Sequence, residues 1–331
     1  MKNILNRLIQ HQILNKKESK EVLYNIADGK YNPSQISAFL TVYMMRSISV
    51  KELEGFRDAL LDLCVHINLE EFDPIDLCGT GGDNKNTFNI STLASFVTAG
   101  AGIPVAKHGN YGVSSTCGSS NVMEYLGIKF SNDEDFLKKC IDKAGICILH
   151  APLFHPAMKN VAPIRKELAV KTFFNMLGPM VNPSFPKNQI VGVFSLELAR
   201  IYGYLYQNSK KNFNIIHSLD GYDEISLTGS TKTISNIKEE LIEPKDFGLS
   251  ILKKEEIKGG NSIESAAKIF LSILSGAGTE AQNQVVCANS GIAIATKMDV
   301  SPKEGYEKAK ESLVSGKAMQ ALNTIQKLSS Q

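Results

Sequence analysis

The chain has 331 residues, of which 43% are hydrophobic and 21% are charged, as in an ordinary globular protein. Its 36 lysines and arginines nearly balance 34 aspartates and glutamates, so the net charge of +2 gives no basic field that would favour nucleic acid as a partner. No stretch approaches the ~18 apolar residues of a membrane span, and the six cysteines lack paired spacing. We expect a cytoplasmic protein of about two domains, at ~150 residues per domain, that binds no membrane.

Residues 1–66 are predicted to be helical throughout. Asp28-Gly29 predicts the end of a helix and Pro33-Ser34 the start of the next one. Apolar residues recur at helical spacing in four stretches, at 4–9, 22–26, 36–44 and 53–61. Four short helices without a strand form a small α-domain. A domain of this size is too small to bury all of its apolar faces by itself. These apolar faces would be covered by a second copy of the chain or only by the chain's own larger domain. The sequence does not decide between these two arrangements.

A glycine-rich loop follows the first predicted strand, at 74–78. The loop is Gly79-Thr80-Gly81-Gly82-Asp83, whose glycines allow a turn and the close approach of a ligand. Asn89, Ser91 and Thr92 stand at the start of the next predicted helix, where unpaired N–H groups attract an anion. The loop lacks the spacing of a P-loop or of a dinucleotide fold. Taken alone, it is a phosphate pocket or a generic tight turn.

A second polar loop follows the next predicted strand, at 103–107. It begins with Lys107-His108-Gly109-Asn110 and runs through several glycines and serines to Asn121. Two successive strand–helix units would place both loops at the C-terminal edge of a parallel sheet. One fixed cation, several hydroxyls and exposed backbone N–H groups suit a pyrophosphate or a sugar phosphate. A plain surface loop is the alternative, and it explains poorly why two such loops lie so close together.

From Phe72 onward, predicted strands and helices alternate, which indicates an α/β domain. Strands are predicted at 146–149, 189–194 and 213–217, and helices at 122–126, 133–143 and 196–206. Beyond Glu264 the chain is predicted to be helical to its end, with a break between two helices at Gly276–Gly278.

Two adjacent carboxylates, Asp223 and Glu224, lie in a loop that we expect to enter a strand. Two adjacent carboxylates repel each other unless water solvates them or a cation bridges them. A solvated acidic turn is the usual explanation. Mg²⁺ is the alternative, because it prefers a few protein oxygens plus water and substrate phosphates, which Ser91, Asp223 and Glu224 would satisfy.

The motifs together resemble those of the anthranilate phosphoribosyltransferase family. The residues that carry the resemblance, in order, are 79–83, Asn89-Ile90-Ser91-Thr92, 107–110 and Val113-Ser114-Ser115, and the similarity covers nearly the whole chain. It implies a nucleoside phosphorylase/phosphoribosyltransferase-like architecture, with a central, mostly parallel sheet flanked by helices and a separate small all-α domain. The implied domains are 1–66, joined in space by part of 160–182, and 72–331. The family forms a homodimer through the helical domain.

The resemblance implies transfer of the phosphoribosyl group from 5-phosphoribosyl 1-pyrophosphate (PRPP) to the amino group of anthranilate, in tryptophan synthesis. The products are N-(5-phosphoribosyl)anthranilate and pyrophosphate. Mg²⁺ is the implied cofactor, with two ions per subunit, and Ser91, Asp223 and Glu224 match the family's metal site. The residues that match donor-binding positions are Gly79, Thr80, Gly82, Asp83, Thr87, Asn89, Ser91, Thr92, Lys107, Ser115 and Ser119.

The implied acceptor site consists of Gly79, His108, Asn110, His155 and Arg165. Arg165 matches the arginine that contacts the anthranilate carboxylate, a task suited to a planar guanidinium; a surface ion pair with Glu167 is the alternative. A histidine beside a proline, such as His155, is more often structural than catalytic. An aromatic amine is unprotonated at neutral pH, so no general base is required, and His108, Asn110 and Arg165 position the acceptor.

The chain departs from the family pattern at several positions of the second loop. Tyr111-Gly112 stand where many members carry Arg followed by Ser or Ala, Thr116 where many carry a basic residue, and Ser120-Asn121 where many carry Ala-Asp. One cation near the phosphates is therefore missing. Donor affinity can differ as a result, while the reaction class should be the same.

Two other functions compete with this one. Pyrimidine nucleoside phosphorylases share the architecture and a Lys-His-Gly loop, but they are usually longer and need no paired acidic metal ligands, so Asp223 and Glu224 count against them. A non-catalytic, nucleic-acid-binding relative would have a basic groove and a degraded acceptor site. The net charge of +2 and the presence of Arg165 count against that function.

Overall fold

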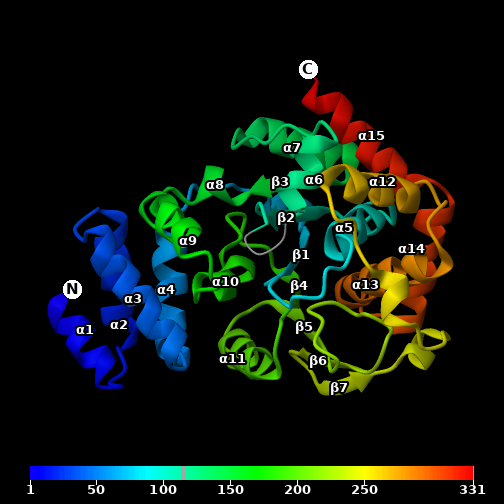
Figure 1. Cartoon of the computed structure of the whole chain (residues 1–331). Coiled ribbons are helices and arrows are strands. Elements are labelled where there is room, and N and C mark those ends of the chain that lie inside the picture. Colours follow the sequence, from blue (N-terminus) through cyan, green and yellow to red (C-terminus); the bar gives the residue numbers. More distant parts are fainter. Residues whose placement is uncertain (113–116, 331) are drawn as a thin grey trace.

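Four helices form a lobe at the N-terminal end of the chain, drawn in blue in Figure 1. The computed structural model describes residues 1–112 and 117–330. Capping boxes start three of the four helices, at Asn15, Asn32 and Ser49. The small all-helical domain predicted at this end of the chain is confirmed. Its helices are α1 (Lys2–Ile9), α2 (Lys16–Ala27), α3 (Pro33–Met45) and α4 (Val50–Asp62).

Seven strands form one sheet in the order β3-β2-β1-β4-β5-β6-β7. The strands from β3 to β5 are parallel, whereas β6 and β7 are antiparallel at one edge. The prediction of a mostly parallel central sheet is confirmed. The strand order reverses between β1 and β4, and α/β proteins bind ligands outside the carboxyl ends of the strands at such a point. The strands are β1 (Ile75–Gly79), β2 (Val105–Gly109), β3 (Ile146–His150), β4 (Asn188–Gly192), β5 (Asn212–Ser218), β6 (Thr231–Ser235) and β7 (Glu239–Ile242).

Helices flank this sheet (Figure 1). None of the helices in the described residues combines the length and the apolarity needed to cross a membrane. The predicted break at Gly276–Gly278 separates α12 from α13 and is confirmed. The α-helices are α5 (Ile90–Gly100), α6 (Ser119–Tyr125), α7 (Glu134–Ala144), α8 (Ala151–Phe154), α9 (Ala162–Leu168), α10 (Phe174–Leu177), α11 (Leu196–Gln207), α12 (Ile263–Leu274), α13 (Glu280–Met298), α14 (Pro302–Val314) and α15 (Lys317–Ser329). Short 3₁₀ turns are η1 (Glu70–Phe72), η2 (Pro156–Asn160), η3 (Gly178–Val181), η4 (Pro244–Phe247) and η5 (Lys254–Ile257).

Two hydrophobic clusters form the core. One joins α5 and α12 to α15 with strands β1 to β3. The other joins the helical lobe to α9, α10, α11 and side chains of β4 and β5. In the second cluster the ring of Phe173 stacks on Phe56 with centroids 4.6 Å apart and meets the edge of Phe39 at 6.0 Å. A segment from the middle of the chain therefore returns to complete the core of the helical lobe.

The antiparallel edge of the sheet differs from the sequence-based expectation. We expected the loop of Asp223 and Glu224 to enter a strand, but the next strand, β6, starts only at Thr231. The strands β6 and β7 were not predicted. Both are short, and β7 is mostly exposed with charged residues at Glu239 and Glu240. An exposed edge strand lacks the apolar run by which the buried strands were found.

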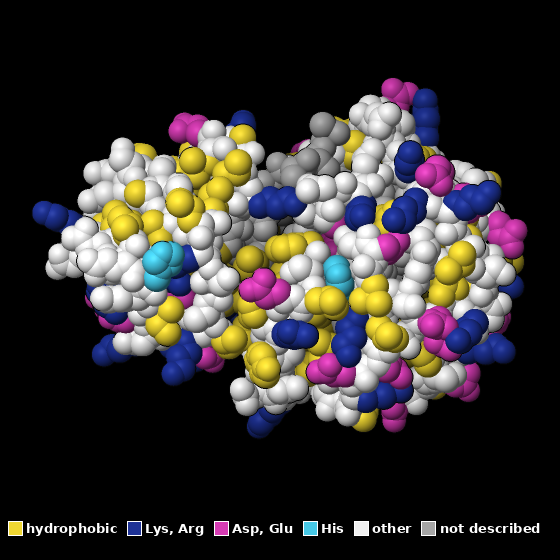
Figure 2. All heavy atoms as spheres, turned by 60° about the horizontal axis from the view of Figure 1, so that its bottom comes forward, with side chains coloured by type: hydrophobic (Ala, Val, Ile, Leu, Met, Phe, Trp, Pro, Cys, Tyr) yellow, Lys and Arg dark blue, Asp and Glu magenta, His cyan; other side chains and the backbone are white. Residues whose placement is uncertain are grey.

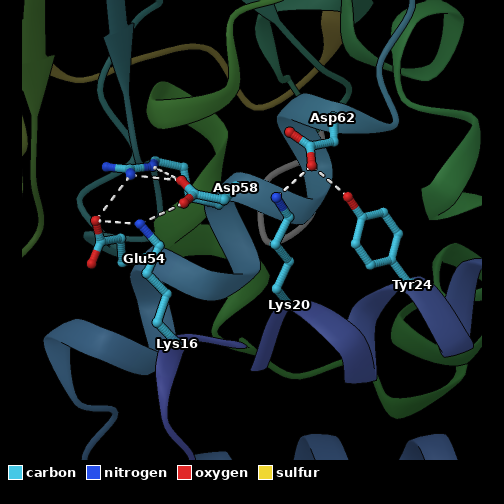
Figure 3. Close-up of polar contacts among 7 residues, drawn as sticks. Lys16, Lys20, Tyr24, Glu54, Asp58 and Asp62 are labelled. Carbon is cyan, nitrogen blue, oxygen red and sulfur yellow. Dashed lines mark hydrogen bonds and ion pairs between the residues drawn. The ribbon is translucent and has the colours of Figure 1, made fainter. Parts of the chain in front are cut away.

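A stripe of ion pairs runs between α2 and α4. Lys16 Nζ lies 2.8 Å from a carboxylate oxygen of Glu54 and 2.8 Å from one of Asp58. Exposed pairs of this kind contribute about 0–1 kcal/mol each, so the stripe fixes how the two helices are paired more than it stabilises them. Figure 3 shows the stripe from both helices, with Lys16, Lys20, Tyr24, Glu54, Asp58 and Asp62 labelled.

The strongest polar contact in the helical lobe is buried. Glu52 has no exposed surface, and its carboxylate accepts hydrogen bonds from the backbone N–H groups of Leu14 (3.0 Å) and Ser49 (2.9 Å) and from the hydroxyl of Tyr43 (2.8 Å). It also pairs with the Arg46 guanidinium. Burial raises the pKa of Glu52, but Arg46 and the backbone donors outweigh burial and hold the pKa below its usual value. One carboxylate thereby joins three segments of the lobe.

We predict that Glu52→Gln lowers the free energy of unfolding by about 3–5 kcal/mol, because it leaves the Arg46 charge buried without a carboxylate. Glu54→Gln on the same helix should cost only about 0–1 kcal/mol, because its partners are partly exposed. Urea unfolding followed by circular dichroism measures both. Equal losses for the two variants would contradict the importance of the buried pair.

Candidate functional site

A cavity of about 710 Å³ opens where β1 and β2 end, between the two lobes. It is lined by both polar loops, the start of α5, the acidic pair and residues of α9 and α10. Ser115 lies outside the described residues. Of the other predicted site residues, all but His155 line the cavity: Gly79, Thr80, Gly82, Asp83, Thr87, Asn89, Ser91, Thr92, Lys107, His108, Asn110, Ser119, Arg165, Asp223 and Glu224.

The glycine loop turns sharply after β1 and leaves donors unused. Gly81 and Gly82 adopt φ angles of 62° and 81°, which are left-handed and favour glycine. The N–H of Thr80 donates to the Gly192 carbonyl at 2.8 Å, and that of Gly81 donates to Asp223 Oδ2 at 2.7 Å. The N–H groups of Gly82 and Asp83 have no hydrogen-bond partner among the described residues. Such free amides in a turn bind anions.

Close packing brings the acidic pair against the strand ends. A side chain at Gly192, the last residue of β4, would place its Cβ 1.7 Å from the Asp223 carbonyl oxygen. At Gly79, the last residue of β1, a Cβ would lie 2.8 Å from Asp223 Oδ2. Strand β4 must therefore end in glycine for the Asp223-Glu224 loop to reach the cavity, whereas a side chain at Gly79 would only shift the Asp223 carboxylate.

The acidic pair forms no ion pair with a lysine, arginine or histidine among the described residues, although the charge of Lys107 acts on Glu224. Burial raises the pKa of Asp223, and the nearby Asp83 raises it further. Burial also raises the pKa of Glu224, with repulsion from Asp223 as the next cause. Glu224 accepts a hydrogen bond from the N–H of Ser91 at 3.2 Å. One oxygen of Asp83, Oδ2, is buried without a hydrogen-bond partner.

These carboxylates fit a divalent cation that is shared with a ligand. Within the described residues, no three His, Cys, Asp or Glu side chains are arranged to hold one ion between them. Asp223, Glu224 and the start of α5 would hold a Mg²⁺ ion, which commonly takes its other ligands from water and phosphate oxygens.

Lys107 brings a buried positive charge to the end of β2. Only 3% of its surface is exposed, and its Nζ donates to the Leu77 carbonyl at 2.6 Å. Its charge opposes the rise in the pKa of Glu224. The carbonyl satisfies one of its three donors, and the Lys107 side chain lines the cavity.

His108 follows Lys107 and is neutral. Burial, with His155 as the next cause, lowers its pKa to about 3. Its Nδ1 lies 3.1 Å from the Gly178 carbonyl oxygen, which can only accept, so Nδ1 carries the hydrogen. The other nitrogen, Nε2, is therefore a hydrogen-bond acceptor, and it is buried without a partner.

His155 does not line the cavity, contrary to the expectation from the resemblance. Its ring lies behind His108, with centroids 5.4 Å apart. Burial lowers the pKa of His155 to about 4, against the opposing effect of backbone groups of Val181 and Leu60. Its position indicates support for His108 rather than contact with a ligand.

Arg165 presents a guanidinium without a carboxylate partner. It makes no ion pair with Glu167 or with any other acidic residue in the described part of the chain, and its Nη2 donates to Asn175 Oδ1 at 3.1 Å. The guanidinium lies 5.5 Å from the centre of the Phe174 ring. Burial lowers the pKa of Arg165 to about 10, and its Nε is buried without a partner. A carboxylate ligand would satisfy this group.

Hydrogen bonds hold the second loop in place. The carbonyl of Asn110 accepts from the N–H of Ser120 at 3.2 Å and from the Ser119 hydroxyl at 3.1 Å. The Asn89 amide donates to the Cys117 carbonyl at 2.9 Å, which ties this loop to the start of α5. Asn110, Ser119 and Asn89 are therefore connected across the cavity wall.

The departures from the family pattern make contacts of their own. The Tyr111 ring meets the ring of His150 edge-on at 4.7 Å, and its hydroxyl donates to Glu124 at 3.3 Å. Asn121 Oδ1 accepts from the N–H groups of Gly112 (3.1 Å) and Gly118 (3.2 Å). Thr116 lies outside the described residues. Tyr111 thus contacts protein groups.

Two functional candidates were missed from the sequence. Lys171 donates to the Gly82 carbonyl and so connects the segment between α9 and α10 to the glycine loop. Asn175 Oδ1 accepts from both Arg165 and the N–H of Thr172 (3.2 Å). Only the fold brings Lys171 to Gly82. The ten-residue spacing of Arg165 and Asn175 across a turn was a local signal that could have been used.

The chain matches two families of known proteins along most of its length. Residues 71–319 match the glycosyl transferase family, a/b domain, and residues 2–64 match the glycosyl transferase family, helical bundle domain. It is 70% identical over 329 residues to an anthranilate phosphoribosyltransferase of Flavobacterium psychrophilum, covering 99% of this chain and 100% of that one. A Bacteroides fragilis enzyme of the same name is 52% identical over 329 residues, with 99% of both chains covered.

Solved structures give the same result. Anthranilate phosphoribosyltransferase from Thermus thermophilus superposes with a TM-score of 0.91 at 30% identity, covering 99% of each chain. The Saccharomyces cerevisiae enzyme in complex with PRPP and Mg superposes with a TM-score of 0.89 at 27% identity, covering 98% of this chain and 96% of that one.

We predict that Gly192→Ala weakens Mg²⁺ binding in the presence of pyrophosphate roughly tenfold, because the added Cβ displaces the Asp223 backbone and misplaces its carboxylate. Isothermal titration measures the affinity. Gly203→Ala on α11 is the control, since its Cβ would lie 3.5 Å from Ile234, an ordinary contact. Equal affinities in the two variants would argue against the close packing of the acidic pair as a functional requirement.

Proposed function

The chain belongs to the anthranilate phosphoribosyltransferase family, and from this premise we propose how its residues divide the reaction between donor and acceptor. The enzyme is a glycosyltransferase that moves the phosphoribosyl group of PRPP to the amino group of anthranilate in tryptophan synthesis. Loss of pyrophosphate leaves positive charge on the sugar carbon, as in glycoside cleavage. The protein must therefore offset charge on the leaving group and align the attacking amine.

Donor binding is assigned to the two polar loops and the start of α5. The free N–H groups of Gly82 and Asp83 would donate to the pyrophosphate oxygens, and the Lys107 ammonium would offset their charge. Hydroxyl and amide groups would hold the remaining donor oxygens. These come from Thr80, Thr87, Asn89, Ser91, Thr92, Ser115 and Ser119, next to Gly79.

Asp223, Glu224 and Ser91 would hold Mg²⁺. When bound, the ion neutralises charge on the departing pyrophosphate. Support comes from the acidic pair, in which burial and the neighbouring carboxylates raise the pKa of both groups, and from the yeast relative, whose structure was solved with PRPP and Mg. We propose two ions per subunit, since Asp83 adds a third carboxylate beside the pair.

Arg165 would bind the anthranilate carboxylate, held in place by Asn175. The observation that carries this assignment is a partly buried guanidinium that has no acidic partner among the described residues, in the same cavity as the free amides of the glycine loop. The neutral Nε2 of His108 would accept a hydrogen bond from the acceptor amine, and Asn110 would help to orient it. Positioning of this kind is worth several kcal/mol.

The alternative functions are less compatible with the molecule. The acidic pair reaches the cavity, whereas a nucleoside phosphorylase needs no such metal ligands. On the face drawn in Figure 2, basic and acidic side chains are interspersed over the larger lobe, without the basic groove that single-stranded nucleic acid requires.

A homodimer through the helical lobe forms part of the proposal. Large apolar side chains are exposed near the ends of α1 and α3, with exposed fractions of 63% for Ile9, 56% for Ile13, 43% for Met44 and 81% for Met45. Hydrophobic side chains are also prominent on this lobe in Figure 2. Exposed apolar patches of this kind are typical of protein interfaces.

We also propose a cytoplasmic location and a division into domains 1–66 and 72–331, with part of 160–182 belonging to the helical domain. The six cysteines, all of them within the described residues, form no disulfide, which fits a reducing compartment.

We predict that Arg165→Ala raises KM for anthranilate roughly 30-fold or more and changes KM for PRPP much less, because a charge-assisted hydrogen bond contributes about 2 kcal/mol or more. Loss of anthranilate fluorescence with PRPP and Mg²⁺ measures both constants. Arg200→Ala, at an exposed position of α11, is the control. Equal effects on both constants would refute the role of Arg165, and an inactive wild-type protein would refute the proposed function.

We predict that Met45→Asp converts the dimer to a monomer, because a charge would be buried in the apolar contact. Analytical ultracentrifugation measures the mass. Ile237→Asp, in the turn between β6 and β7, changes a side chain that is 79% exposed and should leave the dimer intact. A monomeric wild-type protein, or a dimer that persists in Met45→Asp, would overturn the proposed interface.

A further inference from the structure

A buried aspartate lies in β1 and has no role in the reaction described above. Asp76 has no exposed surface. Its oxygens accept hydrogen bonds from two neutral groups, the N–H of His108 at 3.2 Å and the side-chain amide of Gln189 at 3.0 Å. Burial raises the pKa of Asp76, and the charge of Lys107 opposes the rise. A carboxylate in such a place is costly, so its presence calls for a physical reason.

The backbone pairing of strands β1 and β2 ends next to Asp76. Strands β1 and β4 pair over five residues, and so do β2 and β3, but β1 and β2 pair only at Ile75 and Val105. Beyond that pair, the backbones of β1 and β2 no longer hydrogen-bond to each other as a ladder. Lys107 and His108 lie on this part of β2.

Side chains replace the missing ladder. Lys107 Nζ donates across the gap to the Leu77 carbonyl of β1, and Asp76 of β1 accepts from the N–H of His108 in β2. Each strand thus contributes one charged side chain that hydrogen-bonds to the backbone of the other strand. The gap leaves room for side chains at the cavity floor while both strands stay aligned.

A ring of hydrogen bonds, closed by the peptide link between Gly178 and Pro179, passes through Asp76. From Asp76 it continues to the Gln189 amide, which also donates to the Pro179 carbonyl. The adjacent carbonyl, that of Gly178, accepts from Nδ1 of His108, whose own N–H returns to Asp76. His108 is therefore held at both its backbone and its ring.

Gln189 is itself fixed in one orientation. Its Oε1 accepts from the hydroxyl of Tyr206 at 2.9 Å and from Lys211 Nζ at 3.1 Å. Both of those groups donate to it, so the amide nitrogen must point toward Asp76 and Pro179. The direction of every bond in the ring is thereby determined.

We propose that Asp76 is a positioning residue for the transfer reaction, which anchors the ring that presents Nε2 of His108 as a hydrogen-bond acceptor to the substrate amine. The inference rests on the proposed function, since it names what orients a group of that same site. Asp76 acts only through His108 and contacts no substrate. The two oxygens of a carboxylate can accept hydrogen bonds from both neighbours at once. An asparagine would place its own NH₂ group, which is a donor, against one of these two donors.

Asp76→Asn and Gln189→Met test the proposal. Gln189→Met nearly preserves the side-chain volume but removes the bonds to Asp76 and Pro179, together with those accepted from Tyr206 and Lys211. In both variants we expect kcat/KM for anthranilate to fall about tenfold or more, with little change in KM for PRPP in Gln189→Met. The ¹⁵N spectrum of labelled histidines should show the Nδ1–H form of His108 in the wild type and a mixture of ring forms in the variants, with His108→Gln used to assign the signal.

Ser312→Ala is the matched control, because it removes a buried hydrogen bond from α14 to the Val97 carbonyl of α5, away from the ring. It should lower stability without altering the histidine spectrum or the kinetic constants. The proposal is overturned if both variants fold and keep the wild-type spectrum and kcat/KM. If Asp76→Asn does not fold, the histidine spectrum and kcat/KM of Gln189→Met decide whether the proposal stands. An inactive wild type that keeps the Nδ1–H form would reject the proposed function and leave the ring supported.

Discussion

Charged side chains of both signs lie buried or partly buried around one cavity without forming ion pairs with each other, and the rest of the structure depends on keeping them apart. Within the described part of the chain, Asp223 and Glu224 form no ion pair, Lys107 donates to a carbonyl, and Arg165 donates to an amide. Unpaired buried charge destabilises a folded chain by several kcal/mol. Substrates that carry pyrophosphate and carboxylate groups would offset that cost, so stability and binding are linked at this site.

The backbone makes this separation possible. Parallel strands end at one edge, and the glycine at the end of β4 lets the acidic loop approach. The partial separation of β1 and β2 gives Lys107 a carbonyl instead of a carboxylate. Neutral partners hold the charged side chains in position and leave their charge available to a ligand.

Sequence reasoning found the parts of the site that are local. The glycine loop, the Lys107 loop and the acidic pair are contiguous motifs, and the start of α5 follows from helix chemistry. It missed contacts between distant segments, because only the fold brings Lys171 to Gly82. Asp76 was counted within an apolar strand, because no spacing reveals that two strands part beside it. The edge strand β6 buries threonines rather than an apolar run, and β7 is mostly exposed, so neither has a strong apolar pattern.

The Phe56–Phe173 stack has a consequence for biosynthesis. The helical lobe is synthesised first, yet Phe173 follows the end of α4 by more than a hundred residues. At about 5–20 residues per second, the ribosome takes roughly 5–20 seconds to supply it. During that interval the nascent lobe exposes aromatic surface that its own helices cannot cover. Co-translational chaperones that bind aromatic segments would find their target there, before the larger lobe exists.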